Sequence, residues 1–313
     1  MKKIYKLIAF IMLFVTCLGL VSCDNTKKTE KVKIIVPSGT PTLGVAEALD
    51  KHSDLIDYEI VAGSDALIAG FTNSSYDIII APVNLGAKFY QSLNNYNYSF
   101  YQTIVGGCFY LVSTEKLNDI TDLNGREATV FGLTATPGIV YRSLIHYYNV
   151  DVKTNYINDV TEANAALISG NATTIVSAQP SISKFNASGK YYTLDLQEEW
   201  KKMAGSDYAI PQAGIFVKTD KLKDETVKKV LTYMNDSLTL ATSAPNKLAT
   251  SAVNVDETLS KIGVETLVKA IPNCHFINEK YNKLEIEFYF NKLIELGLGK
   301  TIGDKLPDED FYA

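Results

Sequence analysis

Apolar residues along the chain follow two alternating spacings. Short runs rich in β-branched residues occupy positions 32–36, 58–62 and 77–81. After each run, apolar residues recur every three or four positions, which is typical of a helix, whereas the runs themselves are typical of strands. The run 77–81 reads DIIIA, the continuous apolar pattern of a strand buried in a parallel sheet. This alternation with short connections predicts an α/β fold built on a doubly wound sheet.

The pattern restarts near Gly106 and then changes character. Predicted strands and helices alternate again, over residues 108–113, 127–131, 134–148, 155–157, 160–169, 173–177, a helix opened by 179–181, and a last strand at 212–217. From Asp224 onward the pattern is mostly helical, over residues 228–241, 257–270 and 279–296. The Asn- and Tyr-rich residues 91–100 are expected to form a loop. We therefore expect two α/β units and a helical C-terminal segment.

The first 23 residues differ from the rest. Three lysines precede an uncharged stretch, residues 7–20, and small residues follow. This layout predicts a signal peptide over residues 1–22. Fourteen helical residues span about 21 Å, which is short of a hydrocarbon core of about 30 Å. The alternatives are a signal anchor and an ordinary signal peptide without a lipid.

Residues 20–23 (LVSC) resemble a bacterial lipobox. The resemblance implies cleavage before Cys23 and a lipid-modified Cys23, carrying diacylglyceryl and palmitate-type acyl chains, on the extracytoplasmic face of the cell membrane. Residues 23–31 are then the lipidated cysteine and a polar tether. Cleavage removes three lysines and no acidic residue, so the formal net charge changes from −5 to −8.

Composition excludes several classes of function. The chain has 313 residues, 46% hydrophobic and 21% charged, which is enough to bury a core. The negative charge makes a nucleic-acid surface unexpected. Three histidines and four cysteines show no metal-ligand spacing, so we expect no metal and no cofactor. Cys108 and Cys274 are expected as buried free thiols, with a disulfide as the alternative.

Candidate ligand-binding residues follow the predicted strands. In an open α/β sheet, ligands bind beyond the carboxyl ends of the strands, where helix N-termini present unpaired N–H groups. We expect Thr40 and Thr134 to lie at helix caps. The candidate set comprises Ser38, Gly39, Thr40, Ser64, Asp65, Pro82, Asn84, Tyr110, Thr134, Thr136, Gln179 and Gln212. Each cap taken alone is explained by helix capping, whereas the ordered set predicts a cleft between the two units.

Residues 58–90, reading YEIVAGSDALIAGFTNSSYDIIIAPVNLGAKFY, resemble the first lobe of solute-binding proteins of bacterial ABC importers. The nitrate/sulfonate/taurine and thiamine-precursor group is the most similar. The likeness extends to residues 123–132 and to residues 211–217, and covers nearly all of the mature chain. It implies the periplasmic-binding-protein-like type II fold.

The resemblance implies two lobes that close on a solute and deliver it to ABC permease subunits. By analogy, lobe 1 comprises residues 32–105 with 219–313, and lobe 2 comprises residues 106–218. The hinge is expected at residues 105–108 and 217–220. A monomer is expected, with a small-molecule solute and the membrane as partners and no nucleic acid.

The kind of solute is only partly indicated. The two arginines, Arg126 and Arg142, lie outside the candidate loops, and Lys88 is expected to be solvated. Micromolar binding needs about 8 kcal/mol, whereas one helix N-terminus contributes about 0.3 to 1 kcal/mol to an anion. Aromatic burial should supply the difference, with Phe109, Tyr110, Phe131 and Tyr141 near the cleft. This favours an organic solute over bare nitrate.

Two other functions remain open. One is a surface lipoprotein or adhesin without a transport ligand. The other is an enzyme of pyrimidine-precursor synthesis on the same fold, although the iron-binding cysteine cluster of that relative is absent here. No Gly-x-Ser-x-Gly motif is present either, so a non-enzymatic binder is expected. Convergence of Ser38, Ser64, Asn84, Thr134 and Gln179 on one cavity would favour solute binding.

Overall fold

The computed structural model describes residues 30–186 and 188–313. The chain divides into residues 1–31 and one compact body, Val32–Ala313. This body contains both α/β units, and each unit is named below by its sheet. The expected signal peptide, Cys23 and most of the tether lie outside the described residues. Among the residues described, no helix is both long and apolar enough to cross a membrane.

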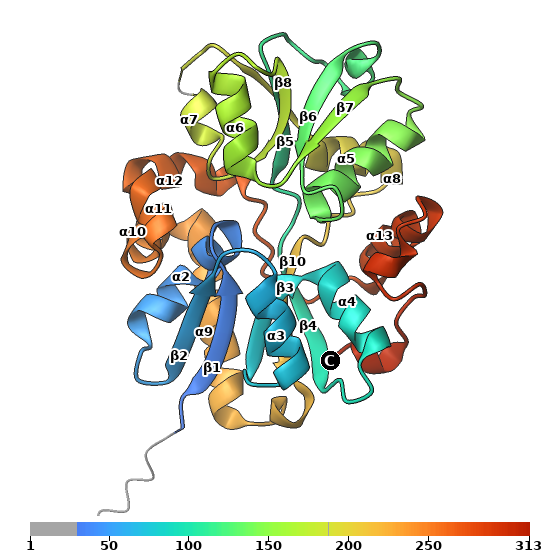
Figure 1. Ribbon diagram of the computed structural model, residues 1–313. Coiled ribbons are helices and arrows are strands. Elements are labelled where there is room, and N and C mark those ends of the chain that lie inside the picture. Colours follow the sequence, from blue (N-terminus) through green and yellow to red (C-terminus); the bar gives the residue numbers. More distant parts are fainter. Residues whose placement is uncertain (1–29, 187) are drawn as a thin grey trace, which may run out of the picture. The chain divides into compact units, whose positions relative to one another are not determined.

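The first sheet has five strands in the order β2-β1-β3-β10-β4 (Figure 1). Their bounds are β1 Val32–Pro37, β2 Ile56–Val61, β3 Ile78–Pro82, β4 Tyr98–Val105 and β10 Ala213–Lys218. β1 pairs in parallel with β2 and β3, whereas β10 runs antiparallel to β3 and β4. Ile78, Ile79 and Ile80 are fully buried, in agreement with the apolar pattern of that run.

The second sheet also has five strands, in the order β7-β6-β8-β5-β9. Their bounds are β5 Phe109–Ser113, β6 Glu127–Phe131, β7 Lys153–Ile157, β8 Thr174–Ala178 and β9 Tyr192–Asp195. β6 is parallel to β7 and β8, and β5 is antiparallel to β8 and β9. Each sheet therefore combines a parallel part with antiparallel strands, and the predicted α/β class is confirmed.

Helices connect and cover both sheets. Those of the two α/β units are α2 Thr40–Lys51, α3 Asp65–Asn73, α4 Val83–Ser92, α5 Thr136–Tyr147, α6 Val160–Ile168, α7 Ser183–Asn186 and α8 Leu196–Ala204. The C-terminal helices are α9 Glu225–Ser243, α10 Pro245–Val255, α11 Glu257–Ile262, α12 Val264–Ala270 and α13 Lys283–Glu295. Short 3-10 turns are η1 Ile120–Leu123, η2 Thr219–Lys221, η3 Ile271–Asn273, η4 Gly299–Thr301 and η5 Glu309–Phe311.

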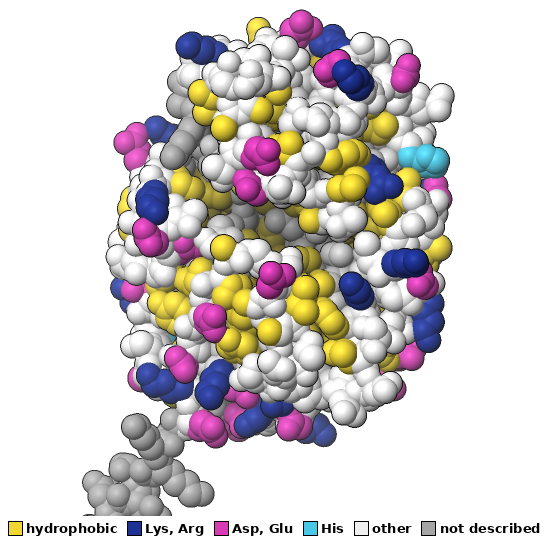
Figure 2. Space-filling view, in the orientation of Figure 1, with side chains coloured by type: hydrophobic (Ala, Val, Ile, Leu, Met, Phe, Trp, Pro, Cys, Tyr) yellow, Lys and Arg dark blue, Asp and Glu magenta, His cyan; other side chains and the backbone are white. Residues whose placement is uncertain are grey.

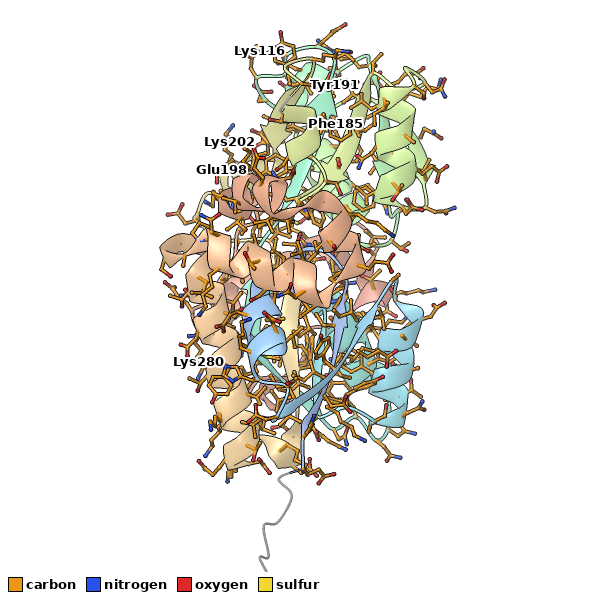
Figure 3. The ribbon with its side chains drawn as sticks, turned by 90° about the vertical axis from the view of Figure 1, so that its left-hand side faces the viewer. Lys116, Phe185, Tyr191, Glu198, Lys202 and Lys280 are labelled. Carbon is orange, nitrogen blue, oxygen red and sulfur yellow. The ribbon has the colours of Figure 1, made fainter. Side chains whose placement is uncertain are left out.

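The C-terminal helices pack against both α/β units. α10 packs on α2 of the first unit, and α12 contacts α7 of the second. Two views show α10 to α12 beside both units (Figures 1 and 3). The C-terminal segment therefore bridges the two sheets.

The position of β10 corrects the expected division of the chain. β10 was expected to end lobe 2 at residue 218, but it pairs with β3 and β4 of the first sheet. The chain therefore leaves the second unit after α8, and its second crossing lies within residues 205–212 rather than at 217–220. The first crossing lies between β4 and β5, at residues 106–108, as expected.

Several elements differ from the sequence-based expectations. The expected loop over residues 91–100 is wrong at its end, because β4 begins at Tyr98. The polar residues Ser99, Gln102 and Thr103 are buried in this strand, which the polar composition did not indicate. β9, α8 and α10 were not expected. The predicted helix 257–270 is divided into α11 and α12 at Gly263, where φ is +85°. A φ of this sign favours glycine and ends the first helix.

A glycine lets α4 lie against β10. A methyl group built on Gly86 would come within 2.1 Å of the Phe216 ring, which is fully buried on β10. The same helix carries Asn84 and Lys88. The close approach at Gly86 therefore fixes the position of the α4 backbone from which the Asn84 and Lys88 side chains extend.

Gly86→Ala should destabilise the fold by about 1 to 3 kcal/mol, because overpacking outweighs the higher helix propensity of alanine. Urea unfolding followed by circular dichroism measures the difference. Gly70→Ala in α3 is the matched control, because its methyl group would lie 3.2 Å from the nearest atom, on the Tyr76 ring. Equal stability of the two variants would contradict the close-packing argument.

Candidate functional site

A cavity of about 690 Å³ lies between the two sheets. Much of its lining comes from the loops after β1 and β3 of the first sheet and after β6 and β8 of the second. The space-filling view shows a hollow at this level, with apolar side chains around it (Figure 2). The volume lies within the range of small-molecule sites.

Ten of the twelve candidate residues line this cavity. They are Ser38, Gly39, Thr40, Ser64, Pro82, Asn84, Thr134, Thr136, Gln179 and Gln212. Asp65 and Tyr110 are not part of the lining. Asp65 is exposed at the start of α3, and the Tyr110 hydroxyl donates to the Asn273 carbonyl at 3.0 Å. Ser38, Ser64, Asn84, Thr134 and Gln179 therefore converge on one cavity, which separate helix caps would not require.

Four helices begin at the cavity without a side-chain cap. The N-cap residues of α2, α3, α4 and α5 are Gly39, Ser64, Pro82 and Ala135, all of which line the cavity. None of their side chains accepts a hydrogen bond from its helix. The expected caps at Thr40 and Thr134 are each wrong by one position: α2 begins one residue earlier than expected, at Thr40 itself, and α5 begins one residue later, at Thr136. α10 also lacks a side-chain cap, but its N-cap Ala244 is not in the lining.

Five other helices are capped by acidic or amide side chains, whereas α10 and α12 are not. Asp159, Asp195, Asp224, Asp256 and Asn282 cap α6, α8, α9, α11 and α13. Each accepts one or more backbone N–H groups, the usual way to satisfy a helix start. The uncapped starts at the cavity leave N–H groups and positive dipole ends available to a ligand.

Two of the candidate hydroxyls already have partners within the protein. Ser38 Oγ donates to Asp256 Oδ2 at 2.7 Å, and Thr40 Oγ1 donates to the Gln179 carbonyl at 2.7 Å. The second bond joins α2 of the first unit to the loop after β8 of the second. Ser38 and Thr40 therefore hold the walls of the cavity in place.

The sequence analysis did not identify several of the lining residues. Lys88 and Lys300 are exposed side chains in the lining, and α11 adds Thr258, Leu259 and Ile262. Lys88 was expected on a solvated face, and its place on α4 one turn after Asn84 was the available signal. No local signal places Lys300 or α11 near residues more than 200 positions earlier.

The charge of the lining has one sign. Lys88 and Lys300 are its charged side chains, and no Asp, Glu, Arg or His of the described residues belongs to it. Phe109 and Phe131 also line the cavity, as expected, whereas Tyr110 and Tyr141 do not. The arrangement can hold an organic anion with an apolar part.

Cys108 is a buried free thiol in the same lining. Burial raises its pKa, although Thr40 and Gln212 partly offset that effect through hydrogen bonds. Cys274 is also free and buried, and burial raises its pKa well above the ordinary value. Both thiols are therefore protonated near neutral pH and poor nucleophiles. No group of three or more metal-ligating side chains occurs within the part of the chain that is described.

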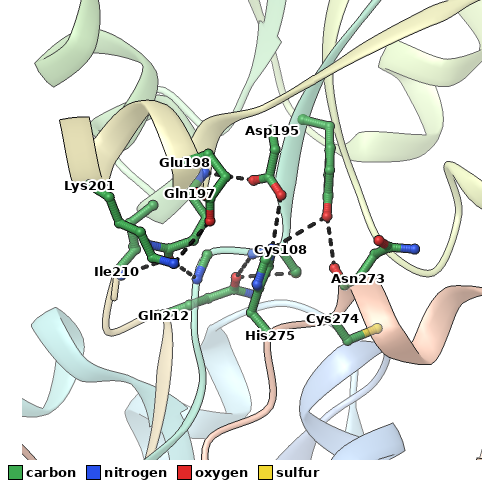
Figure 4. Close-up of polar contacts among 12 residues, drawn as sticks. Cys108, Asp195, Gln197, Glu198, Lys201, Ile210, Gln212, Asn273, Cys274 and His275 are labelled. Atoms are coloured by element: carbon green, nitrogen blue, oxygen red, sulfur yellow. Dashed lines mark hydrogen bonds and ion pairs between the residues drawn. The ribbon is translucent and has the colours of Figure 1, made fainter. Parts of the chain in front are cut away.

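Two glutamines connect the chain segments that cross between the sheets (Figure 4). Gln197 Oε1 accepts the N–H groups of Gly107 and Ile210, both at 2.9 Å, and its Nε2 donates to the Tyr208 carbonyl at 3.1 Å. Gln212 Oε1 accepts the Cys108 N–H at 3.1 Å. Both crossings are thereby held by side chains as well as by backbone pairing.

The C-terminal segment passes beside the same crossings. His275 Nε2 lies 3.0 Å from Asp195 Oδ2, and the His275 carbonyl accepts the Gly106 N–H at 2.8 Å. The chain therefore passes through this region three times, and each pass is joined to another by hydrogen bonds.

Comparisons with known proteins bear on this arrangement. A family model described as "Menaquinone biosynthesis" matches residues 92–298. No match was found among curated proteins.

Similar solved structures cover most of the chain. One is an ABC transporter from Parabacteroides distasonis, at 20% identity and TM-score 0.75, covering 90% of this chain and 98% of that one. Another is the periplasmic aliphatic sulphonate binding protein SsuA from Escherichia coli, at 11% identity and TM-score 0.66, covering 89% and 93%. A third is the alkanesulfonate-binding protein SsuA from Xanthomonas axonopodis pv. citri bound to MOPS, at 13% identity and TM-score 0.60, covering 90% and 96%. The expected resemblance is confirmed for the fold.

Gln197→Leu should lower the free energy of unfolding by about 2 to 4 kcal/mol, because it leaves two buried N–H groups without an acceptor. Thermal and urea unfolding measure the loss. The control is Glu198→Leu on the same helix, since Glu198 pairs at the surface with Lys201. A Gln197→Leu loss no larger than that of the control would show that the crossings do not depend on this side chain.

Proposed function

We propose a function from one premise: the chain belongs to the family that the menaquinone-biosynthesis model describes. The proposed role is capture of a small organic solute in the cavity and its delivery to an ABC import permease. The solved structures of the same fold that are named as sulfonate-binding proteins support this choice. Cys23 is proposed as the lipid anchor, which would hold the protein at the extracytoplasmic face of the membrane.

One observation carries the proposal: four uncapped helix starts and two aromatic rings line one cavity between the sheets. The helix starts provide hydrogen-bond donors, and Phe109 and Phe131 provide apolar contact. Together they supply the directional and the hydrophobic parts of solute binding. A surface protein without a ligand needs neither.

Binding is proposed to shift the two units toward a closed state. A solute shifts such an equilibrium only by its differential affinity for the two states. Contacts from the second unit, including Thr134 and Thr136, therefore drive closure after the solute has met the first unit. The Thr40–Gln179 hydrogen bond joins the units without involving the solute.

A second candidate function is an enzyme of menaquinone biosynthesis, which the family description favours. Acid–base chemistry would need titratable groups within reach of the substrate. The lining offers Lys88, Lys300 and Cys108, and the Cys108 pKa is raised. This set supports binding over catalysis.

The full chain should bind at least one solute from a panel of taurine, alkanesulfonates, nitrate, thiamine, pyrimidine precursors, riboflavin and amino acids. At a hundredfold excess over Kd, binding adds about 2.7 kcal/mol, which raises the midpoint of thermal unfolding by several degrees. Ala135→Trp should abolish the shift by filling the cavity, because Ala135 is an exposed lining residue. Ala69→Trp, exposed on α3 away from the cavity, is the matched control. A flat panel, or equal shifts in both variants, would count against cleft binding.

A binding protein should also release its solute unchanged. We expect mass spectrometry to recover the added solute intact after prolonged incubation with the purified chain. Deletion of the gene should reduce solute uptake and leave cellular menaquinone unaffected. Conversion of the solute, or loss of menaquinone with normal uptake, would favour the enzyme instead.

A further inference from the structure

Asn84 is a buried side chain in the cavity lining with an oxygen that lacks a partner. It lies at the second position of α4, and 8% of its surface is exposed. Its Oδ1 accepts no hydrogen bond from any described residue, and the atom is shielded from solvent. An unpaired buried carboxamide oxygen destabilises the protein unless another group donates to it.

Gln179, which lines the cavity from the second unit, has an unpaired donor instead of an unpaired acceptor. It follows β8 and is 4% exposed. Its Oε1 accepts the Ser183 hydroxyl at 2.9 Å, whereas its Nε2 has no acceptor among the described residues. The cavity therefore has an unpaired acceptor on the first unit and an unpaired donor on the second.

These two atoms differ from the other unpaired groups of the protein. The remaining ones are hydroxyl groups and the Trp200 indole nitrogen, and none of their residues lines the cavity. A hydroxyl can rotate toward a new partner, but a planar carboxamide presents its oxygen and nitrogen in fixed directions. Buried carboxamide atoms without a partner thus occur, within the described residues, only at the cavity where a solute is expected.

The charge of the same cavity adds a third requirement. Four uncapped helix starts and the two lysines favour a negative group on the solute. An inorganic anion or an alkanesulfonate would satisfy these groups. The oxygens of either anion only accept hydrogen bonds, so they would leave Asn84 Oδ1 unpaired.

We infer that the cavity selects an organic anion that also carries an N–H donor and a carbonyl acceptor facing different walls of the cavity. The donor pairs with Asn84 Oδ1, the acceptor pairs with Gln179 Nε2, and the negative group faces the uncapped helix starts. Because the two carboxamides belong to different units, such a solute also joins the units. This inference rests on the proposed solute-binding function and narrows its substrate class.

Four probes separate the requirements. Orotate has a carboxylate with ring N–H and carbonyl groups, benzoate has the charge and ring alone, uracil has the donor and acceptor without the charge, and ethanesulfonate has only the charge. Isothermal titration of the full chain should give a Kd for orotate at least tenfold lower than for each other probe. A solute lacking a group that a buried site pairs with is rejected by about tenfold or more.

Asn84→Leu tests the pairing directly. The variant should bind orotate about tenfold more weakly and benzoate as the unchanged chain does, and its unfolding midpoint should not fall, because Asn84 Oδ1 has no intramolecular bond to lose. Thr103→Val is the control, since Thr103 is also buried with an unpaired side-chain oxygen but lies outside the lining. It should change binding of neither probe.

Two results would overturn the inference. Benzoate or ethanesulfonate binding as tightly as orotate would remove the donor–acceptor requirement while leaving solute binding intact. Binding of none of the four probes would also reject the proposed class. In that event, the broader solute panel decides separately whether the protein binds solutes at all.

Discussion

The start of every α-helix leaves backbone N–H groups that the helix itself cannot pair, and the treatment of these groups organises this structure. At five helices, Asp and Asn side chains pair them, as Asp224 does at α9. At the cavity the corresponding residues are Gly39, Ser64, Pro82 and Ala135, and none of them supplies a cap. These four starts lack the stabilisation that a side-chain cap gives, although at α2 Asp256 accepts the Gly39 N–H.

Much of the fold and of the candidate site is predictable from the sequence because both depend on local pattern. Strand runs such as DIIIA indicated which loops follow the strands. Ten of the twelve candidate residues chosen on that basis line one cavity. What local pattern cannot supply is long-range pairing. β10 resembles a closing strand of the second unit, yet it lies between β3 and β4 of the first sheet. Lys300 and α11 reach the cavity through the packing of the C-terminal segment, for which no short-range signal exists.

The crossings show why the two units can form one cavity. Gly106 and Gly107 are tightly surrounded, and a methyl group on Gly107 would come within 2.4 Å of Ile210. Close approach allows the single carboxamide of Gln197 to accept from both passing segments. A buried acceptor shared by two segments fixes their spacing more firmly than apolar contact would, because hydrogen bonds are directional. The two crossing segments are therefore held at a fixed spacing at this point.

Asp256 explains how a carboxylate can be buried close to a site proposed for anions. Its Oδ1 accepts N–H groups at the start of α11, and its Oδ2 accepts Ser38 Oγ and the Gly39 N–H. Four donors thus disperse its negative charge. The Gly39 N–H is one of the groups at the start of α2, so this helix is already partly satisfied by an anion of the protein. The starts of α4 and α5 have no such carboxylate partner among the residues described. The negative group of a solute should therefore lie toward α4 and Lys88, on the side of the cavity where Asn84 also lacks a donor.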